Sequence, residues 1–259
     1  MVGTLYWLSL RRVENRNRRW PPMRTLSFFG GLIVVMLATQ SFIGVYDTTL
    51  FSIHVVQHVM LAMVAPLLLV AGAPVTLAIQ AADRHLQVGI VSFMRSRTIT
   101  FLTRPLFAWV LYAAIMFAYY FSPIYGLSLR SDFAHELVHV AFLFVGSLFF
   151  WSVIGVDQGP NTVGYPARIL ALLAAMPFHA FLGVAILSSS EILGGDFYRQ
   201  LDRDWGPSLV ADQQAGGVLM WVCGAIVTVV ALLVIAWRWR QSDLREARRA
   251  DRAVECGSL

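Results

Sequence analysis

The sequence predicts an all-α fold, a polytopic transmembrane bundle of six spans with both termini in the cytoplasm. Three observations support this prediction. Hydrophobic residues make up 58% of the 259 residues and charged residues only 14%, which is roughly half the charged share of a soluble domain. The apolar residues gather in runs close to the ~20 residues that an α-helix needs to cross hydrocarbon. The arginines lie beside these runs, mostly on one side of the predicted membrane.

The chain is interpreted as a single integral membrane domain, residues 1–259. Within it we distinguish an arginine-rich cytoplasmic segment at 1–25, the six-span bundle at 26–237 and a cytoplasmic tail at 238–259. The first ten residues, MVGTLYWLSL, are apolar but too short to cross. We therefore expect them to form an interfacial anchor or the remainder of a further span. The tail mixes charges of both signs at helical spacing, which indicates a solvated helix.

Six apolar runs are expected to cross the membrane, each with a length near that of a spanning helix. They are residues 26–46, 50–71, 105–121, 133–155, 167–189 and 211–237. Pro66 and Pro177 lie inside the second and fifth runs and are expected to bend them, which membrane helices tolerate. The half-polar segment 74–101 is expected to lie along the cytoplasmic interface.

The distribution of arginine predicts the orientation. All twenty basic residues are arginines; seventeen lie before the first span, between spans two and three, at the start of span five or after span six. Arg130, Arg199 and Arg203 lie on the other side. The positive-inside rule therefore places both termini in the cytoplasm. Because these charges flank apolar runs, we expect a lipid bilayer as the surrounding partner and no nucleic acid.

Five of the six histidines fall in the outer half of this predicted bundle. His54 and His58 open the second span, His135 and His139 open the fourth, and His179 lies roughly 15 Å below the outer end of the fifth. A single buried histidine is more often structural than a ligand. Two His-x-x-x-His pairs at matched depth favour metal or haem ligation, because each pair presents two imidazoles on one helix face.

Imidazole donors suit copper, zinc, iron and nickel, and thioethers favour Cu(I). The candidate thioether ligands near the histidines are Met63, Met176 and Met220. Each of them alone is more often a packing residue, because methionine fills core gaps readily.

The HELVH stretch at residues 135–139 also has the spelling of a zinc protease, with Glu136 as the general base. Such an enzyme needs a third ligand, and no later span carries a buried aspartate of the expected kind. This alternative also leaves His54 and His58 unexplained. A b-type haem with axial ligands from both helices is a second alternative, although four histidines at one face are an awkward number for one haem.

Four fragments in order identify a family. They are FSIHVVQHVMLAMVAPLLLVAGAP from residue 51, HELVHVAFLFVGSLFFWSVIGVDQGP from 135, AMPFHAFLGVAI from 175 and WGPSLVADQQAGGVLMW from 205. With them, nearly the whole chain resembles the CtaG family of bacterial cytochrome c oxidase assembly proteins. The resemblance implies a multi-pass protein of the bacterial plasma (inner) membrane that assists oxidase assembly by supplying copper, without turnover of its own.

The resemblance also implies site residues. Position by position, the family's two histidine pairs fall on His54 with His58 and on His135 with His139, and its polar entry to the last helix falls on Asp212 and Gln213. We expect Cu(I) to be held by some of these histidines and His179, and we expect Gln57, Glu136, Asp212 and Gln213 to orient the ligands. The metal would pass to oxidase subunits or assembly intermediates at the outer face. There are two departures from the family. Members usually have seven helices, and many have a histidine where Ser122 precedes Pro123 here, so the site is expected to be smaller or to recruit His179.

Overall fold

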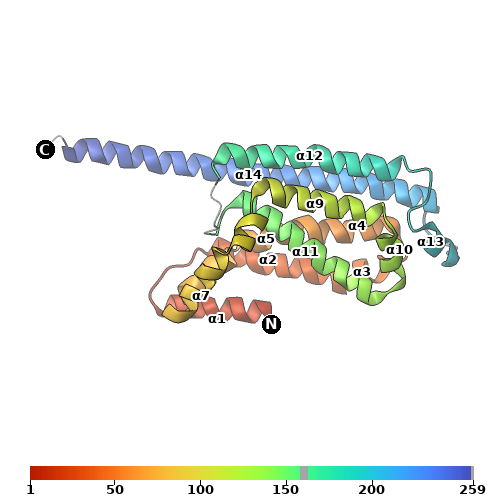
Figure 1. Ribbon diagram of the computed structural model, residues 1–259, viewed down its shortest axis with the longest axis horizontal. Coiled ribbons are helices and arrows are strands. Elements are labelled where there is room, and N and C mark those ends of the chain that lie inside the picture. Colours follow the sequence, from red (N-terminus) through yellow and green to blue (C-terminus); the bar gives the residue numbers. More distant parts are fainter. Residues whose placement is uncertain (158–162, 258–259) are drawn as a thin grey trace.

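The all-α prediction is confirmed by the computed structural model, which describes residues 1–157 and 163–257. Every element in these ranges is helical, and none is a strand. Figure 1 shows an elongated bundle, along which α14 (Leu209–Gly257) runs and then extends past one end. The helices α1 (Val2–Asn15) and α7 (Arg84–Met94) lie toward this end, which we call the arginine-rich end. At the opposite end lie α10 (Pro123–Arg130) and α13 (Gly195–Gln200), and we call it the α10 end.

Within the described residues, five helical stretches are long and apolar enough to cross a membrane. They are α2 (Pro22–Gln40) with α3 (Phe42–Tyr46), the stretch Phe51–Ala81, α11 (Asp132–Ile154), α12 (Tyr165–Leu187) and Leu209–Arg249 of α14. A sixth span is obtained only if α9 (Pro105–Tyr120) and α10 are counted together across a bend of 69°. The third predicted span, 105–121, is thus a 16-residue helix that is short of the ~20 residues for a straight crossing.

The stretch Phe51–Ala81 is not a uniform helix. It consists of α4 (Phe51–Val59), a π-helical turn η1 (Met60–Val64), α5 (Ala65–Ala71) and α6 (Pro74–Ala81). Pro66 explains the irregularity, because it has no N–H to donate to the preceding turn. Single π-helical turns of this kind often occur at functional sites. By contrast, α12 continues as one helix through Pro177.

Glycines let the bundle helices approach closely. A Cβ at Gly146 of α11 would collide with the carbonyl oxygen of Ala62 in η1, so these two backbones are in direct contact. Cβ atoms at Gly183 of α12 and Gly217 of α14 would each lie within 2.7 Å of the other residue's carbonyl oxygen. Small residues at such crossings are typical of membrane helices, which associate by close packing.

The arginine-rich end carries short helices with apolar side chains exposed. In α1, Tyr6 donates a hydrogen bond to the carbonyl oxygen of Gly72 at 3.0 Å, whereas Leu5 and Leu8 are exposed. The helix α7 has no buried residue and exposes Leu86 among other apolar residues. Helices with one apolar face and flanking arginines are typical of the membrane interface. The interfacial position stays a prediction for the first ten residues and for 82–101, which contains α7 and α8 (Arg97–Leu102), whereas residues 74–81 form α6 and belong to the candidate span Phe51–Ala81.

Candidate metal centre

Among the described residues, four histidines from two helices meet toward the α10 end of the bundle. His54 and His58 come from α4, and His135 and His139 from α11. The ring centroids are 4.1 Å apart within the first pair and 4.4 Å within the second, and the His54 and His135 rings are separated by 5.4 Å. All four side chains are buried. The two histidine pairs predicted from the sequence therefore form one cluster.

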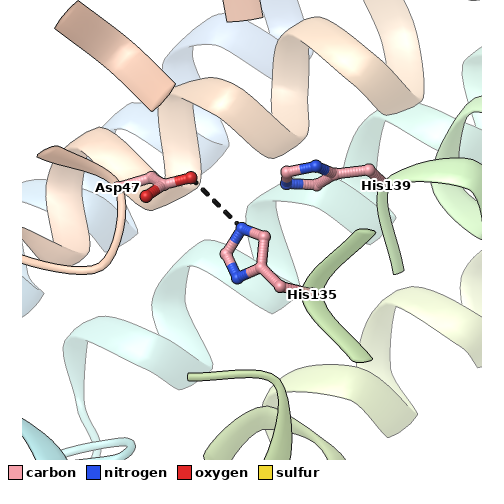
Figure 2. A group of neighbouring side chains, drawn as sticks. All are labelled: Asp47, His135 and His139. Atoms are coloured by element: carbon pink, nitrogen blue, oxygen red, sulfur yellow. Dashed lines mark ion pairs between the residues drawn. The ribbon is translucent and has the colours of Figure 1, made fainter. Parts of the chain in front are cut away.

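A carboxylate that the sequence analysis missed completes this cluster. Asp47 follows α3, is only 5% exposed, and places Oδ2 at 3.1 Å from Nε2 of His135. Figure 2 shows Asp47 pointing toward His135, with the His139 ring beside them. One ligating atom from each of Asp47, His135 and His139 lies within 4.8 Å of the others, so small side-chain rotations bring them around one ion. In the sequence, Asp47 could have been found as the one acidic residue between two apolar runs, seven residues before His54.

The electrostatic environment keeps Asp47 ionised. Burial raises the pKa of this carboxyl, but His135 and the hydrogen bond from Gln57 lower it further, so the pKa lies below its usual value. The cluster thus combines one anionic oxygen donor with neutral nitrogen donors, a set that suits transition metals.

Several ring nitrogens of the cluster are buried without a hydrogen-bond partner among the described residues. They are Nδ1 of His54, Nε2 of His58, Nδ1 of His139 and Nδ1 of His135, whereas Nε2 of His135 faces Oδ2 of Asp47 at 3.1 Å. Buried polar atoms are nearly always paired, and each unpaired one costs about 1–3 kcal/mol. A ring nitrogen that carries a lone pair is the atom with which histidine binds a metal. A neutral imidazole has one nitrogen with a free lone pair, so the four rings can offer four such atoms in one place, which fits a metal ion.

Hydrogen bonds determine which nitrogen of His139 is free. Gln57 donates through Nε2 to Oδ2 of Asp47 at 2.7 Å and to the carbonyl oxygen of Ala38 at 3.0 Å. Its Oε1 must then accept from Nε2 of His139, which is 3.0 Å away. The proton of His139 is accordingly on Nε2, and Nδ1 keeps its lone pair. Gln57 thus orients two cluster residues at once, as expected of a residue that supports metal ligands.

A second chain of hydrogen bonds determines which nitrogen of His54 carries the free lone pair. The Ser128 hydroxyl donates to the carbonyl oxygen of Tyr125 at 2.8 Å, so it can only accept from the Tyr119 hydroxyl, also at 2.8 Å. Tyr119 must in turn accept from Nε2 of His54, at 3.0 Å. The free lone pair of His54 is therefore on Nδ1.

Tyr120 similarly contacts Nδ1 of His58 at 3.1 Å. The sequence analysis missed both tyrosines, because nothing local distinguishes the Tyr119–Tyr120 pair from packing residues in an apolar helix.

His179 stands apart from the cluster, and its predicted recruitment is not supported. Its Nδ1 donates to the carbonyl oxygen of Ala175 at 2.9 Å, and its Nε2 accepts from the Tyr112 hydroxyl at 3.0 Å. With both nitrogens paired, His179 has the environment of a structural core histidine. The candidate thioethers also pack as core residues: Met63 and Met220 are buried in the hydrophobic core, and Met176 is half-buried on α12.

Asp212 acts on the helix that carries His54 rather than on a histidine. Its Oδ2 accepts from the backbone N–H of Phe51 at 2.8 Å, and its Oδ1 accepts from the N–H and hydroxyl of Ser52 at 3.2 and 2.5 Å. Asp212 thus caps the start of α4, where a negative charge is favourable. It fixes the position of the first histidine pair relative to α14.

The other two predicted orienting residues do not hold a histidine. Gln213 accepts from the N–H of Leu193 at 2.8 Å and donates to the carbonyl oxygen of Glu191 at 3.2 Å, and so it ties down the loop after α12. The Glu136 side chain is 69% exposed, and its Oε2 lies 3.7 Å from Nδ1 of His139, which is too long for a hydrogen bond. Of the four predicted orienting residues, Gln57 is the one that makes a hydrogen bond to a histidine of the cluster within the described residues.

A cavity of about 700 Å³ at the α10 end lies next to the cluster. Its lining includes Tyr120 and Tyr125, together with polar residues of α10 and of the segment after α12. Tyr120 contacts His58 on its other side, and the ring centroid of Tyr125 lies 5.3 Å from that of His54. One layer of tyrosine side chains therefore separates this cavity from the histidines.

The chain is similar to proteins of one family. Residues 4–242 match the family described as cytochrome c oxidase caa3 assembly factor. Uncharacterized proteins of Mycobacterium bovis and Mycobacterium tuberculosis are each 34% identical over 257 residues, which is 96% of this chain and 39% of theirs. An uncharacterized protein of Mycobacterium leprae is 33% identical over 98% of this chain and 40% of its own length. The chain thus spans about two-fifths of the curated relatives it matches. No solved structure matches significantly.

Proposed function

Because the chain belongs to the cytochrome c oxidase caa3 assembly factor family, we propose that it binds copper and passes it to the oxidase during assembly. The copper site is the His–Asp centre, which we define as Asp47, His54, His58, His135 and His139. The observation that carries the proposal is the group of buried ring nitrogens without hydrogen-bond partners beside an ionised carboxylate.

Charge balance supports Cu(I) as the bound state. A buried charge is costly unless it is paired, and one carboxylate neutralises a monovalent ion, whereas neutral imidazoles add no charge. The lone pairs at Nδ1 of His54 and Nδ1 of His139 are already oriented by their hydrogen-bonded partners. Imidazole is a donor that suits copper, so no methionine is required.

The proposed delivery route starts at the α10 end. The distribution of arginines supports an orientation with both termini in the cytoplasm and the His–Asp centre toward the outer face of a bacterial plasma membrane. The cavity beside Tyr120 and Tyr125 would then open outward. An oxidase subunit or assembly intermediate docked there would lie one side-chain layer from the copper, and movement of the tyrosines would let ligands be exchanged.

The test in cells uses a strain in which the chain is replaced by the Asp47→Ala or His139→Ala variant. We expect oxidase that is present as protein but has lost most of its copper and its activity, measured by elemental analysis of the purified oxidase. His85→Ala is the matched control, because His85 is exposed on α7, away from the centre. Oxidase with full copper content in the ligand variants would refute the proposed role.

A zinc hydrolase is a second candidate, favoured by one observation. Asp47 supplies the carboxylate that, with His135 and His139, gives the three protein ligands that a catalytic zinc needs. No comparable observation favours haem. The histidine rings of the cluster pack against one another, and a porphyrin could bind between them only by separating the two pairs.

Glu136 distinguishes the hydrolase from the copper proposal. Its exposed carboxylate makes no hydrogen bond to the centre, so we expect Glu136→Gln to leave metal content and oxidase assembly within about twofold of wild type. As a general base, Glu136 would contribute 10²–10⁴-fold to a hydrolytic rate. A variant with normal metal content but no oxidase assembly would therefore favour the hydrolase.

A further inference from the structure

A second cavity, of about 420 Å³, lies at the arginine-rich end, where the start of α2 faces the start of α12 and the middle of α14. Arg24, Arg238 and Arg245 line it, together with Ser27 and Ser242. It lies at the other end of the bundle from the His–Asp centre, and nothing in the copper proposal uses it.

The three arginines have no carboxylate partner within the described part of the chain. Arg238 donates through Nη1 to the carbonyl oxygen of Ile154 at 3.0 Å, and the Arg24 guanidinium lies 4.9 Å from the Trp20 ring centroid. Asp157 exerts an electrostatic effect on Arg24, but its oxygens accept the N–H groups of Val75 and Thr76, and it is not part of the cavity lining. The cavity therefore keeps an excess positive charge and free N–H donors.

Hydrogen bonds to the carbonyl group at the end of α11 use only a small part of the N–H donors of these arginines. The carbonyl oxygen of Ile154 accepts one bond from Arg238 and another, at 3.2 Å, from Arg168 outside the cavity lining. A guanidinium has five N–H donors, so most of those on Arg238 remain available. Within the described residues, Arg24 and Arg245 make no hydrogen bond to this carbonyl group.

The remaining lining indicates what kind of anion fits. Tyr165 and Trp237 flank the arginines, as aromatic residues do at a membrane–water interface. Apolar side chains, including Met23 and Val234, also line the cavity. Guanidinium groups recognise phosphate through paired, charge-assisted hydrogen bonds. Basic pockets between membrane helices are suited to anionic lipid headgroups.

We infer that this cavity binds the phosphate of an anionic phospholipid, with the guanidinium groups of Arg24, Arg238 and Arg245 on the headgroup and an acyl chain along Met23 and Val234. A free phosphate ion would satisfy the same arginines but would leave the apolar wall uncovered. The lipid is therefore the occupant that matches both halves of the cavity.

The test uses the purified full chain in a neutral detergent, titrated with phosphatidylglycerol, phosphatidylcholine or inorganic phosphate. Binding is followed by native mass spectrometry and by tryptophan fluorescence, to which Trp237 in the cavity lining contributes. We expect phosphatidylglycerol to bind at least tenfold more tightly than phosphatidylcholine. A triple variant, Arg24→Gln with Arg238→Gln and Arg245→Gln, should weaken it on the order of 100-fold, at about fivefold per arginine.

The matched control removes three exposed arginines of the same end, by Arg12→Gln, Arg84→Gln and Arg95→Gln. Because salt screens exposed charges that lie away from the bound lipid, the affinity for phosphatidylglycerol should change less than about twofold. If the triple cavity variant does not fold, Arg245→Gln alone, on an exposed side chain, should still show about a fivefold loss. Equal losses in cavity and control variants would overturn the inference. Inorganic phosphate that binds as tightly as the lipid would also overturn it, by assigning the cavity to a soluble anion.

Discussion

A chain in which His54 and His139 are both replaced by alanine is expected to lose its bound copper. The wild-type protein, loaded anaerobically with Cu(I), should retain about one ion per chain, because the centre offers donors for a single site. These two histidines are chosen because their hydrogen bonds direct an Nδ1 lone pair into the centre. Loss of a residue that merely orients a ligand weakens metal binding about 10–100-fold, so loss of two ligands should exceed this. Elemental analysis of copper, zinc and iron measures the outcome.

The matched control for this experiment is His179→Ala. It also removes a buried imidazole from a membrane helix, but one whose two nitrogens are already paired with Ala175 and Tyr112. We expect it to keep its copper, even if it unfolds at a lower temperature. Copper retained by the double variant would contradict the proposed centre, and so would an equal loss of copper in His179→Ala. Zinc in place of copper in the wild-type protein, held by Asp47, His135 and His139, would instead support the hydrolase.

The Gly146→Ala variant is expected to disrupt the centre without changing any of its residues. A Cβ at this position would collide with the carbonyl oxygen of Ala62 and lie 2.8 Å from Cγ of Pro66. Because the clash is with backbone, α11 must move away from η1, and this motion separates the two histidine pairs. Overpacking of this kind costs roughly 1–3 kcal/mol of unfolding free energy. Thermal unfolding in detergent and copper content should both fall.

Gly30→Ala is the matched control, because a Cβ there meets only Leu68 Cδ1 at 3.9 Å, an ordinary contact distance. In a helix interior, alanine is favoured over glycine by up to about 1 kcal/mol, so this variant should be as stable as wild type or more so. If Gly146→Ala matched Gly30→Ala in unfolding temperature and copper content, the close approach of α11 and η1 would not be what brings the histidines together.

Much of the fold was accessible from the sequence because it depends on local patterns. Apolar runs of spanning length predicted the helices, and the spacing of four between His54 and His58 and between His135 and His139 predicted two imidazoles on each of two faces. The four ordered fragments identified the family, which the match over residues 4–242 confirms. The third span was less predictable, because the bend between α9 and α10 lies at the edge of an apolar run.

Which further residues join the two histidine pairs was decided by tertiary structure. Asp47 joins them, His179 does not, and Asp212 caps α4 rather than binding a histidine. Gln57 rather than Glu136 orients His139. The reason is geometric, because periodicity shows which residues share a helix face but not which face of another helix lies opposite. That pairing is set by backbone contacts such as the one between Gly146 and Ala62, which determine how each helix is rotated and how deep it lies.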